Sequence, residues 1–212
     1  MNDFQNGELA GCKIRDSDVD PGKEAKSHSG SCEFLLLFRG LSLVLIVLQV
    51  ISGFFMLFFY VPTPEGAQLS ISYLSTEVPL GWLMRNMHRW CATLLMGTLF
   101  THMAVVFYLK AFRRPRELHW LSGVGQFLVV FFLLLTGVFL PWDWKAFWSF
   151  TILLDYLASW PVMGEWARDF VLDTFTINRI FITHIWILPL VLLVLLVFHV
   201  RMVRKTGISG PL

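Results

Sequence analysis

Charged residues are scarce in this sequence. They make up 15% of its 212 residues, whereas hydrophobic residues make up 56%. Because a soluble globular protein carries about 25% charged and about 45–50% apolar residues, this composition indicates a membrane protein. The net charge of +2 is too small to suggest a nucleic-acid partner.

Cysteines are also few. Cys12, Cys32 and Cys91 are scattered, odd in number, and form no C-x-x-C pair, so they predict no disulfide framework. The first 31 residues are polar and lack the apolar core and small-residue cleavage site of a signal peptide. We therefore interpret residues 1–33 as a loosely folded polar tail and residues 34–212 as a membrane domain.

Long hydrophobic runs are the main feature that is present. A helix that crosses a bilayer needs about 20 mainly apolar residues, and four segments meet this requirement: 34–60, 82–111, 120–140 and 180–203. We expect an all-α bundle of four transmembrane helices. Between the third and fourth helices, residues 147–173 mix aromatic residues with charges and break at 161–164. This pattern predicts one or two amphipathic helices at the membrane interface, and a simple cap over the bundle is the alternative.

The loop charges predict an orientation. The connection between the third and fourth spans is mainly acidic, and the one between the first and second carries Glu65 and Glu77 without a basic residue. The loop between the second and third spans and the C-terminal end are basic; they contain Lys110, Arg113, Arg114, Arg116, Arg201, Arg204 and Lys205. Because cytoplasmic loops carry excess Lys and Arg, we expect both termini on the cytoplasmic (negative) side.

Four histidines fall inside the predicted spans, and no other histidine does. His88 and His102 lie on the second span, and His184 and His199 on the fourth. A histidine within a membrane helix is costly and marks a functional site by default. Spacings of 14 and 15 residues separate the members of each pair by about 21 Å and 22 Å along a helix and leave them on one face.

The orientation predicts which histidines face each other. Both helices run from the positive to the negative side, so His88 should face His184, and His102 should face His199. Two histidines across a gap can hold one planar metal macrocycle by its axial positions, because imidazole suits iron and bundle cores hold such cofactors. Zinc is less favoured because it needs about four ligands at one centre. Hydrogen-bonded packing is the structural alternative.

Glycines and arginines add to this pattern. Gly123 and Gly137 on the third span are 14 residues apart, which matches the histidine spacing. They predict close approach of backbone to a bulky ligand, although glycine also serves plain helix packing in membranes. Arg85 and Arg204 lie near the interfaces, where they could pair with acidic groups of the macrocycle or anchor the chain at the headgroups.

These residues resemble the N-terminal half of cytochrome b, in its short split form, cytochrome b6, over about residues 34–212. The matching stretches are MHRW around His88, RRPREL at 113–118, TGVFLPWD at 136–143, ILP after His184, and RKTGISGPL at 204–212. The resemblance implies two b haems, bound by His88 with His184 and by His102 with His199. It also implies a haem-packing role for Gly40, Gly53, Gly123 and Gly137 and a haem-propionate role for Arg85 and Arg204.

The resemblance also implies an assembly. Its partners would be a subunit IV-like C-terminal half of cytochrome b, a Rieske iron–sulfur protein and a c-type cytochrome, in a dimeric complex surrounded by membrane lipid. A quinol-oxidising pocket is implied on the positive side around residues 138–150. A quinone-reducing pocket is implied near His199 and Arg204. The chain would then be a subunit of a quinol:cytochrome c oxidoreductase that is not active alone.

The sequence departs from the b6 pattern near the start of the first span. The family cysteine that binds a third haem covalently aligns with Leu37, and Cys32 lies upstream of it. We therefore expect no covalent haem c, with Cys32 as its remaining candidate. The family glycine that precedes Gly53 by 14 residues is replaced by Arg39, with Gly40 beside it. Arg39 could reach the haem propionates or the quinone pocket on the negative side.

These features together predict a di-haem electron-transfer subunit in a bacterial inner membrane. A haem b membrane anchor of a dehydrogenase or hydrogenase is an alternative, against which the PREL and GISGPL segments argue. A haem-free scaffold or transporter subunit is a third interpretation.

Overall fold

The structure is a computed structural model that describes residues 24–108, 110, 112 and 116–206. Within this part of the chain every regular element is a helix. The elements are α1 (Glu24–Leu57), α2 (Pro64–Thr76), α3 (Gly81–Tyr108), α4 (Glu117–Phe139), α5 (Trp144–Ala158), α6 (Gly164–Thr174), α7 (Ile177–Ile182), a π-helical turn η1 (Thr183–Ile187) and α8 (Leu188–Thr206).

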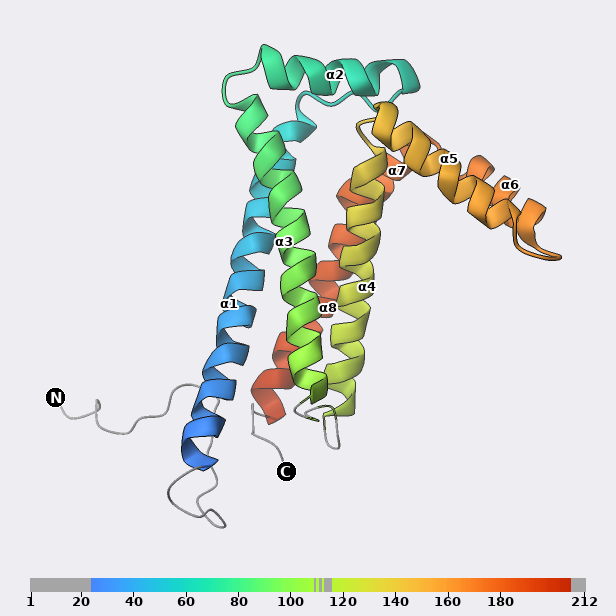
Figure 1. The fold of residues 1–212 in the computed structure, drawn as a ribbon. Helices are drawn as coiled ribbons and strands as arrows, with labels where there is room; N and C mark the ends of the chain where they lie inside the picture. Colours follow the sequence, from blue (N-terminus) through green and yellow to red (C-terminus); the bar gives the residue numbers. More distant parts are fainter. Residues whose placement is uncertain (1–23, 109, 111, 113–115, 207–212) are drawn as a thin grey trace.

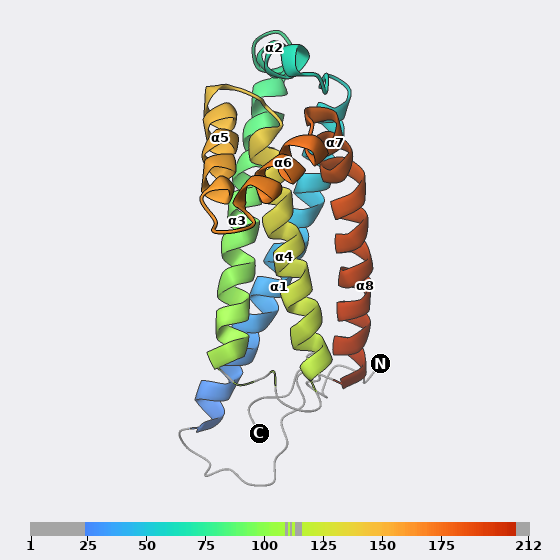
Figure 2. The same ribbon diagram turned by 90° about the vertical axis from the view of Figure 1, so that its right-hand side faces the viewer.

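Four long helices form the bundle, as predicted. The apolar spans are Leu37–Leu57, Gly81–Tyr108, Glu117–Phe139 and Ile177–Lys205. They run alternately up and down, and α2, α5, α6 and α7 all lie at one end (Figures 1 and 2). Only 11–22% of the most apolar part of each span is buried within the chain, so most side chains face lipid, a partner or a bound group.

Two helix pairs make up this bundle. Helix α1 packs mainly against α3, and α4 packs mainly against α8, while α3 and α4 join the two pairs. Helices α3 and α8, which carry the four histidines, make few direct contacts with each other. Each histidine helix is therefore supported by a neighbour rather than by the other histidine helix.

Helices α1 and α4 begin upstream of their predicted starts. Helix α1 begins at Glu24, so residues 24–33 are helical rather than part of a loose tail. Residues 1–23, with Cys12, lie outside the described part. Helix α4 begins at Glu117 rather than at residue 120, because a polar first turn does not register in a hydrophobicity pattern.

A central apolar layer fills the bundle. Its buried members are Leu45, Cys91, Leu95, Val130 and Leu192, contributed by all four long helices. Leu95 falls midway between His88 and His102, and Leu192 falls midway between His184 and His199. The layer therefore separates the two histidine levels, and its van der Waals packing helps to hold the helix pairs together within the bilayer.

Short capped helices cover one end. The Thr63 and Asp143 side chains accept hydrogen bonds from the backbone N–H of Gly66 and Ala146, as N-caps do, and so start α2 and α5. The predicted amphipathic connection is confirmed as two helices, α5 and α6. Gly164 begins α6, and a Cβ atom there would overlap the carbonyl of Ala158, so this tight junction requires glycine.

The π-helical turn has a cause in the sequence. Pro189 follows η1 within the same long span. Proline has no N–H, and its ring clashes with the carbonyl of the residue four before it, which here is Ile185. The wider turn at Thr183–Ile187 accommodates this defect. It also sets the rotation of His184, which lies within it.

Tyr60 follows the membrane span of α1 and contacts the end of α4 and helix α7. Its hydroxyl donates to the carbonyl of Leu140, at an oxygen–oxygen distance of 2.6 Å, and its ring packs on that of Phe181, with centroids 5.2 Å apart. Burial disfavours the charged phenolate and raises the pKa of Tyr60 to about 12. The contact ties the first helix pair to the second at the α2 end.

Candidate functional site

His88 and His184 face each other at the α2 end of the bundle. Their ring centroids lie 6.3 Å apart with an interplanar angle of 60°. Two imidazoles on opposite sides of one metal atom, at about 2 Å per metal–nitrogen bond, place their centroids roughly 6 Å apart. The separation therefore fits a group held axially between the two rings.

Hydroxyl groups hold both rings from behind. The Oγ atom of Ser52 lies 3.0 Å from Nδ1 of His88, and Oγ1 of Thr136 lies 2.9 Å from Nδ1 of His184. Because Nδ1 is engaged in each ring, Nε2 is the nitrogen available to a metal. Metal-binding histidines are commonly oriented in this way by a hydrogen bond at the other ring nitrogen.

Two predicted glycines make room for these rings. A Cβ atom built on Gly53 would lie 3.1 Å from Cε1 of His88, and one on Gly137 would lie 3.1 Å from Cε1 of His184. Both distances are tighter than an ordinary van der Waals contact, so a larger residue would displace the histidine. The glycines of α1 and α4 thus let each imidazole lie close to the neighbouring helix.

The second histidine level is less symmetric. Nδ1 of His199 lies 2.8 Å from Oγ of Ser122, and a Cβ atom on Gly123 would lie at an ordinary 3.8 Å from Cε1 of His199. His102 lies within electrostatic range of His199. In contrast to the other three rings, Nδ1 of His102 is buried without a hydrogen-bond partner among the described residues.

His119 is an additional histidine at this level. Its ring centroid lies 6.4 Å from that of His199 in a T-shaped arrangement. His119 lay just outside the predicted third span, but α4 begins at Glu117 and the span includes this histidine. The sequence did contain a signal for this residue, because His119 directly precedes the predicted start of the third span at residue 120.

The predicted arginines lie at the two ends of the bundle. The Nη1 atom of Arg85 lies 3.4 Å from Oγ of Ser75, which links α3 to α2. The charge of Arg39 is within range of both His102 and His199, and Arg204 is exposed in the last turn of α8.

Gly40 and Cys32 lie on α1. A Cβ atom on Gly40 would meet nothing within 4 Å, so this glycine is not required by packing within the chain. Cys32 lies in the first part of α1, whose side chains are outside the described residues.

Ser52, Ser122 and Thr136 were not predicted as site residues. A signal was present, because each of these hydroxyl residues directly precedes a predicted glycine: Gly53, Gly123 and Gly137. In membrane helices Ser and Thr usually bond their own backbone, so the sequence alone could not reveal that these three also reach a histidine.

The donor set suits a macrocycle better than a bare metal ion. Among the described residues no cluster of three or more histidine, cysteine or carboxylate side chains could hold an ion. Two opposed imidazoles, with their other nitrogens engaged and glycines beside them, supply the axial ligands that a haem iron takes. The residues present therefore fit a haem at the His88–His184 level.

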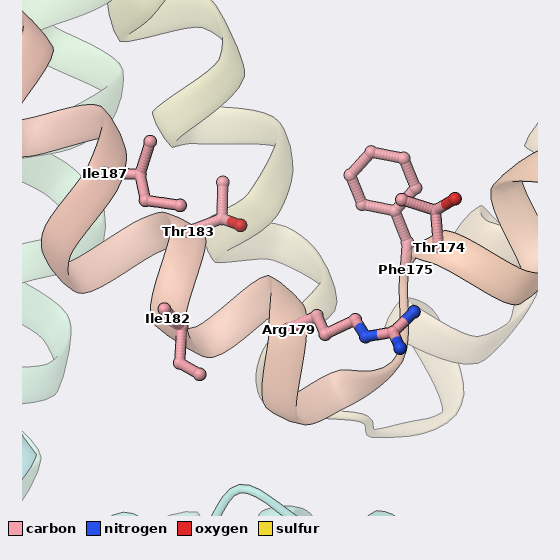
Figure 3. Close-up of a pocket in the computed structure, with 6 residues that line it drawn as sticks. All are labelled: Thr174, Phe175, Arg179, Ile182, Thr183 and Ile187. Carbon is pink, nitrogen blue, oxygen red and sulfur yellow. The ribbon is translucent and has the colours of Figure 1, made fainter.

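A pocket of about 250 Å³ lies beside the π-helical turn. It is lined by Thr174, Phe175, Arg179, Ile182, Thr183 and Ile187, and Figure 3 shows these side chains. The Nη1 atom of Arg179 donates to the backbone carbonyl of Asp173 at 2.6 Å. The pocket contains none of the paired histidines, so it is separate from the site between α3 and α8.

Known proteins provide the comparison for this geometry. A family model described as "Cytochrome b/b6/petB" matches residues 24–207. The menaquinol:cytochrome c reductase cytochrome b subunit of Bacillus subtilis (strain 168) is 38% identical over 205 residues, which cover 94% of this chain and 91% of that protein. Cytochrome b6 of Prochlorococcus marinus (strain NATL1A) is 37% identical over 178 residues, 82% of each chain.

A solved structure agrees with these matches. A chain of the "Hyperthermophilic respiratory Complex III" superposes with a TM-score of 0.76 at 30% identity, over 89% of this chain and 54% of that one. The present chain thus spans about half the length of that chain. The resemblance to the short, b6-like form is confirmed, and this four-helix integral membrane protein belongs to the cytochrome b family.

Proposed function

We propose that this chain is the di-haem b subunit of a quinol:cytochrome c oxidoreductase. His88 and His184 would bind one haem b, and His102 and His199 would bind a second. The single observation that carries the proposal is the 6.3 Å separation of the opposed His88 and His184 rings, in a chain of the cytochrome b family. The B. subtilis relative, which is named as a subunit of such a reductase, supports the same function.

The bound haems would supply one-electron carriers at two depths in the membrane. The protein's part is to hold them at fixed positions and to exclude water between them. The apolar layer around Leu95 and Leu192 does this, because it fills the bundle between the two histidine levels. Arg85 at one end and Arg39 and Arg204 at the other are the candidates to meet the acidic groups of the haems.

The proposed reaction uses both ends of the bundle. Quinol would be oxidised at the positive side, near the end of α4 and the start of α5, within residues 138–150. A quinone would be reduced at the negative side, near His199 and Arg204. The chain would act only with a subunit IV-like C-terminal half, a Rieske iron–sulfur protein and a c-type cytochrome. We place it in a bacterial cytoplasmic membrane with both termini on the cytoplasmic side, which the basic loop between α3 and α4 and the basic C-terminal end support.

Haem binding by single-histidine variants tests this function. The wild-type complex should contain two low-spin b haems by redox titration, and a covalent-haem stain should find no third haem. His102→Leu should remove one of them, because it deletes an axial ligand. His119→Leu is the matched control, since it lies at the same level but is not a proposed ligand, and it should retain both haems. Retention of both haems in His102→Leu would contradict the proposed pairing.

A further inference from the structure

Three hydroxyl residues repeat one arrangement in the bundle. Ser52, Ser122 and Thr136 each lie 2.8–3.0 Å from Nδ1 of a histidine on the neighbouring helix. Each is followed directly by a glycine. The arrangement occurs twice on α4 and once on α1, so three of the four paired histidines share it.

The hydrogen bonds within each helix determine the direction of these contacts. The hydroxyl of Ser52 donates to the carbonyl of Leu48 at 2.6 Å, that of Thr136 to Phe132 at 2.7 Å, and that of Ser122 to His119 at 2.9 Å. A hydroxyl has one proton. Because that proton is used within the helix, the hydroxyl oxygen accepts from the histidine, and Nδ1 carries the ring proton.

Backbone carbonyls support the same assignment. The backbone carbonyl three residues before each hydroxyl residue, that of Gln49, Leu133 or His119, also interacts with the ring of His88, His184 or His199. A carbonyl can only accept, so its presence favours a proton on the ring nitrogen beside it. The protonated Nδ1 leaves Nε2 with its lone pair, which is the form that binds a metal.

The fourth position breaks the repeat. On α4 the two hydroxyl residues are 14 apart, and on α1 the residue 14 before Ser52 is Phe38, followed by Arg39 rather than glycine. Fourteen residues return a helix to within about 40° of the same face, and α1 and α3 run in opposite directions. Phe38 therefore lies at the level of His102, whose buried Nδ1 has no partner among the described residues.

We propose that Ser52, Thr136 and Ser122 are positioning residues that fix the tautomer and ring orientation of His88, His184 and His199, whereas His102 lacks such a residue because Phe38 occupies its place. This inference rests on the proposed haem ligation. It makes the His88–His184 site symmetric, with two oriented ligands, and the His102–His199 site asymmetric, with one. A hydrogen bond accepted from Nδ1 makes the imidazole a stronger ligand, which favours the oxidised iron.

Redox titration of hydroxyl variants in the whole complex tests the proposal. Ser52→Ala and Thr136→Val should raise the midpoint potential of the same b haem, and Ser122→Ala should raise that of the other. Each lost hydrogen bond should change the ratio of oxidised to reduced haem roughly three- to tenfold, where tenfold is about 59 mV for one electron. Ser52→Thr and Thr136→Ser keep the hydroxyl and should restore the wild-type potential.

Thr98→Val is the matched control. Thr98 is a buried threonine of α3 whose hydroxyl bonds the carbonyl of Leu94 at 2.6 Å, so its loss should move neither potential. Phe38→Ser is the converse variant and should lower the potential of the haem that Ser122→Ala raises. Electron paramagnetic resonance of the oxidised haems gives a second readout, because the spectrum depends on ring orientation.

The outcomes separate this proposal from the proposed function. If the wild-type complex lacks two b haems, the ligation itself is wrong. If both haems are present and the three hydroxyl variants titrate as the wild type does, the positioning role is wrong and the ligation stands. The role would also be contradicted if Ser52→Ala and Thr136→Val affected different haems.

Discussion

Substitution of Gly137 by alanine tests how closely α4 approaches His184. A new Cβ atom there would lie 3.1 Å from Cε1 of the histidine, so the ring must move by a few tenths of an ångström. Gly97, on α3, provides the comparison, because a Cβ atom there meets nothing within 4 Å. Both substitutions gain the same helix propensity, which cancels when the two variants are compared.

The expected change in stability is the sum of the gain in helix propensity and the cost of overpacking against the histidine. Replacing a helical glycine by alanine stabilises by about 0.5–1 kcal/mol, which is the whole effect expected for Gly97→Ala. Overpacking costs about 1–3 kcal/mol, so Gly137→Ala should be less stable than Gly97→Ala by about that amount. Gly53→Ala should behave like Gly137→Ala, because its contact with His88 has the same 3.1 Å distance.

The measurement is the free energy of unfolding in mixed micelles, together with the b-haem content of each purified variant. We expect Gly137→Ala and Gly53→Ala to lower the occupancy of the same haem, the one proposed at His88 and His184. Gly123→Ala, whose Cβ would lie at 3.8 Å, should lower the occupancy of the other haem by less. If Gly137→Ala proved as stable as Gly97→Ala and kept its haems, close packing of the histidine against α4 would be refuted.

Three further predictions concern the connections and the orientation. Tyr60→Phe removes the donor to Leu140 and should lower the free energy of unfolding by about 0.5–1.5 kcal/mol. The pKa of Tyr60 rises from 10.0 to about 12 in the fold, so the folded state keeps a proton that the unfolded state loses. Stability should therefore fall as the pH rises from 10 toward 12, and less so in Tyr60→Phe; an equal fall in both would contradict burial of the phenol. Asp143→Ala should cost about 0.5–2 kcal/mol by removing the N-cap of α5, with Asp143→Asn as the control that retains a cap, and hydrogen exchange of α5 would show no change if the cap were unimportant. In a background with the native cysteines replaced by serine, Lys205→Cys and Glu165→Cys should react with an impermeant thiol reagent from opposite sides of the membrane, and labelling from one side would overturn the predicted orientation.

The spans were predictable because a bilayer imposes a simple requirement on composition. Each helix must be about 20 residues of mainly apolar side chains, and this requirement is visible without any knowledge of contacts. The helix α2 was not predicted, because it lies outside the span and is short. Its start was nevertheless encoded, since Thr63 caps it and Pro64 occupies its first turn.

The facing of His88 and His184 was predictable from spacing and direction, whereas the surroundings of the rings were not. Whether Ser52 bonds only its own helix or also reaches His88 depends on the rotation of α1 against α3, and no local pattern determines that rotation. His184 adds a further difficulty. The π-helical turn that carries it shifts the helical phase by part of a turn, so a projection that assumes a regular helix places this residue only approximately.

The division of the bundle into two helix pairs gives the histidines and their supports separate roles. Helices α1 and α4 carry the hydroxyl groups and glycines, while α3 and α8 carry the histidines and hardly touch each other among the described residues. A group bound between His88 and His184 would therefore join the two pairs directly. Because binding to the folded state alone stabilises that state, such a group would contribute to holding the bundle together, and its loss should loosen the contact between the pairs before it unfolds either one.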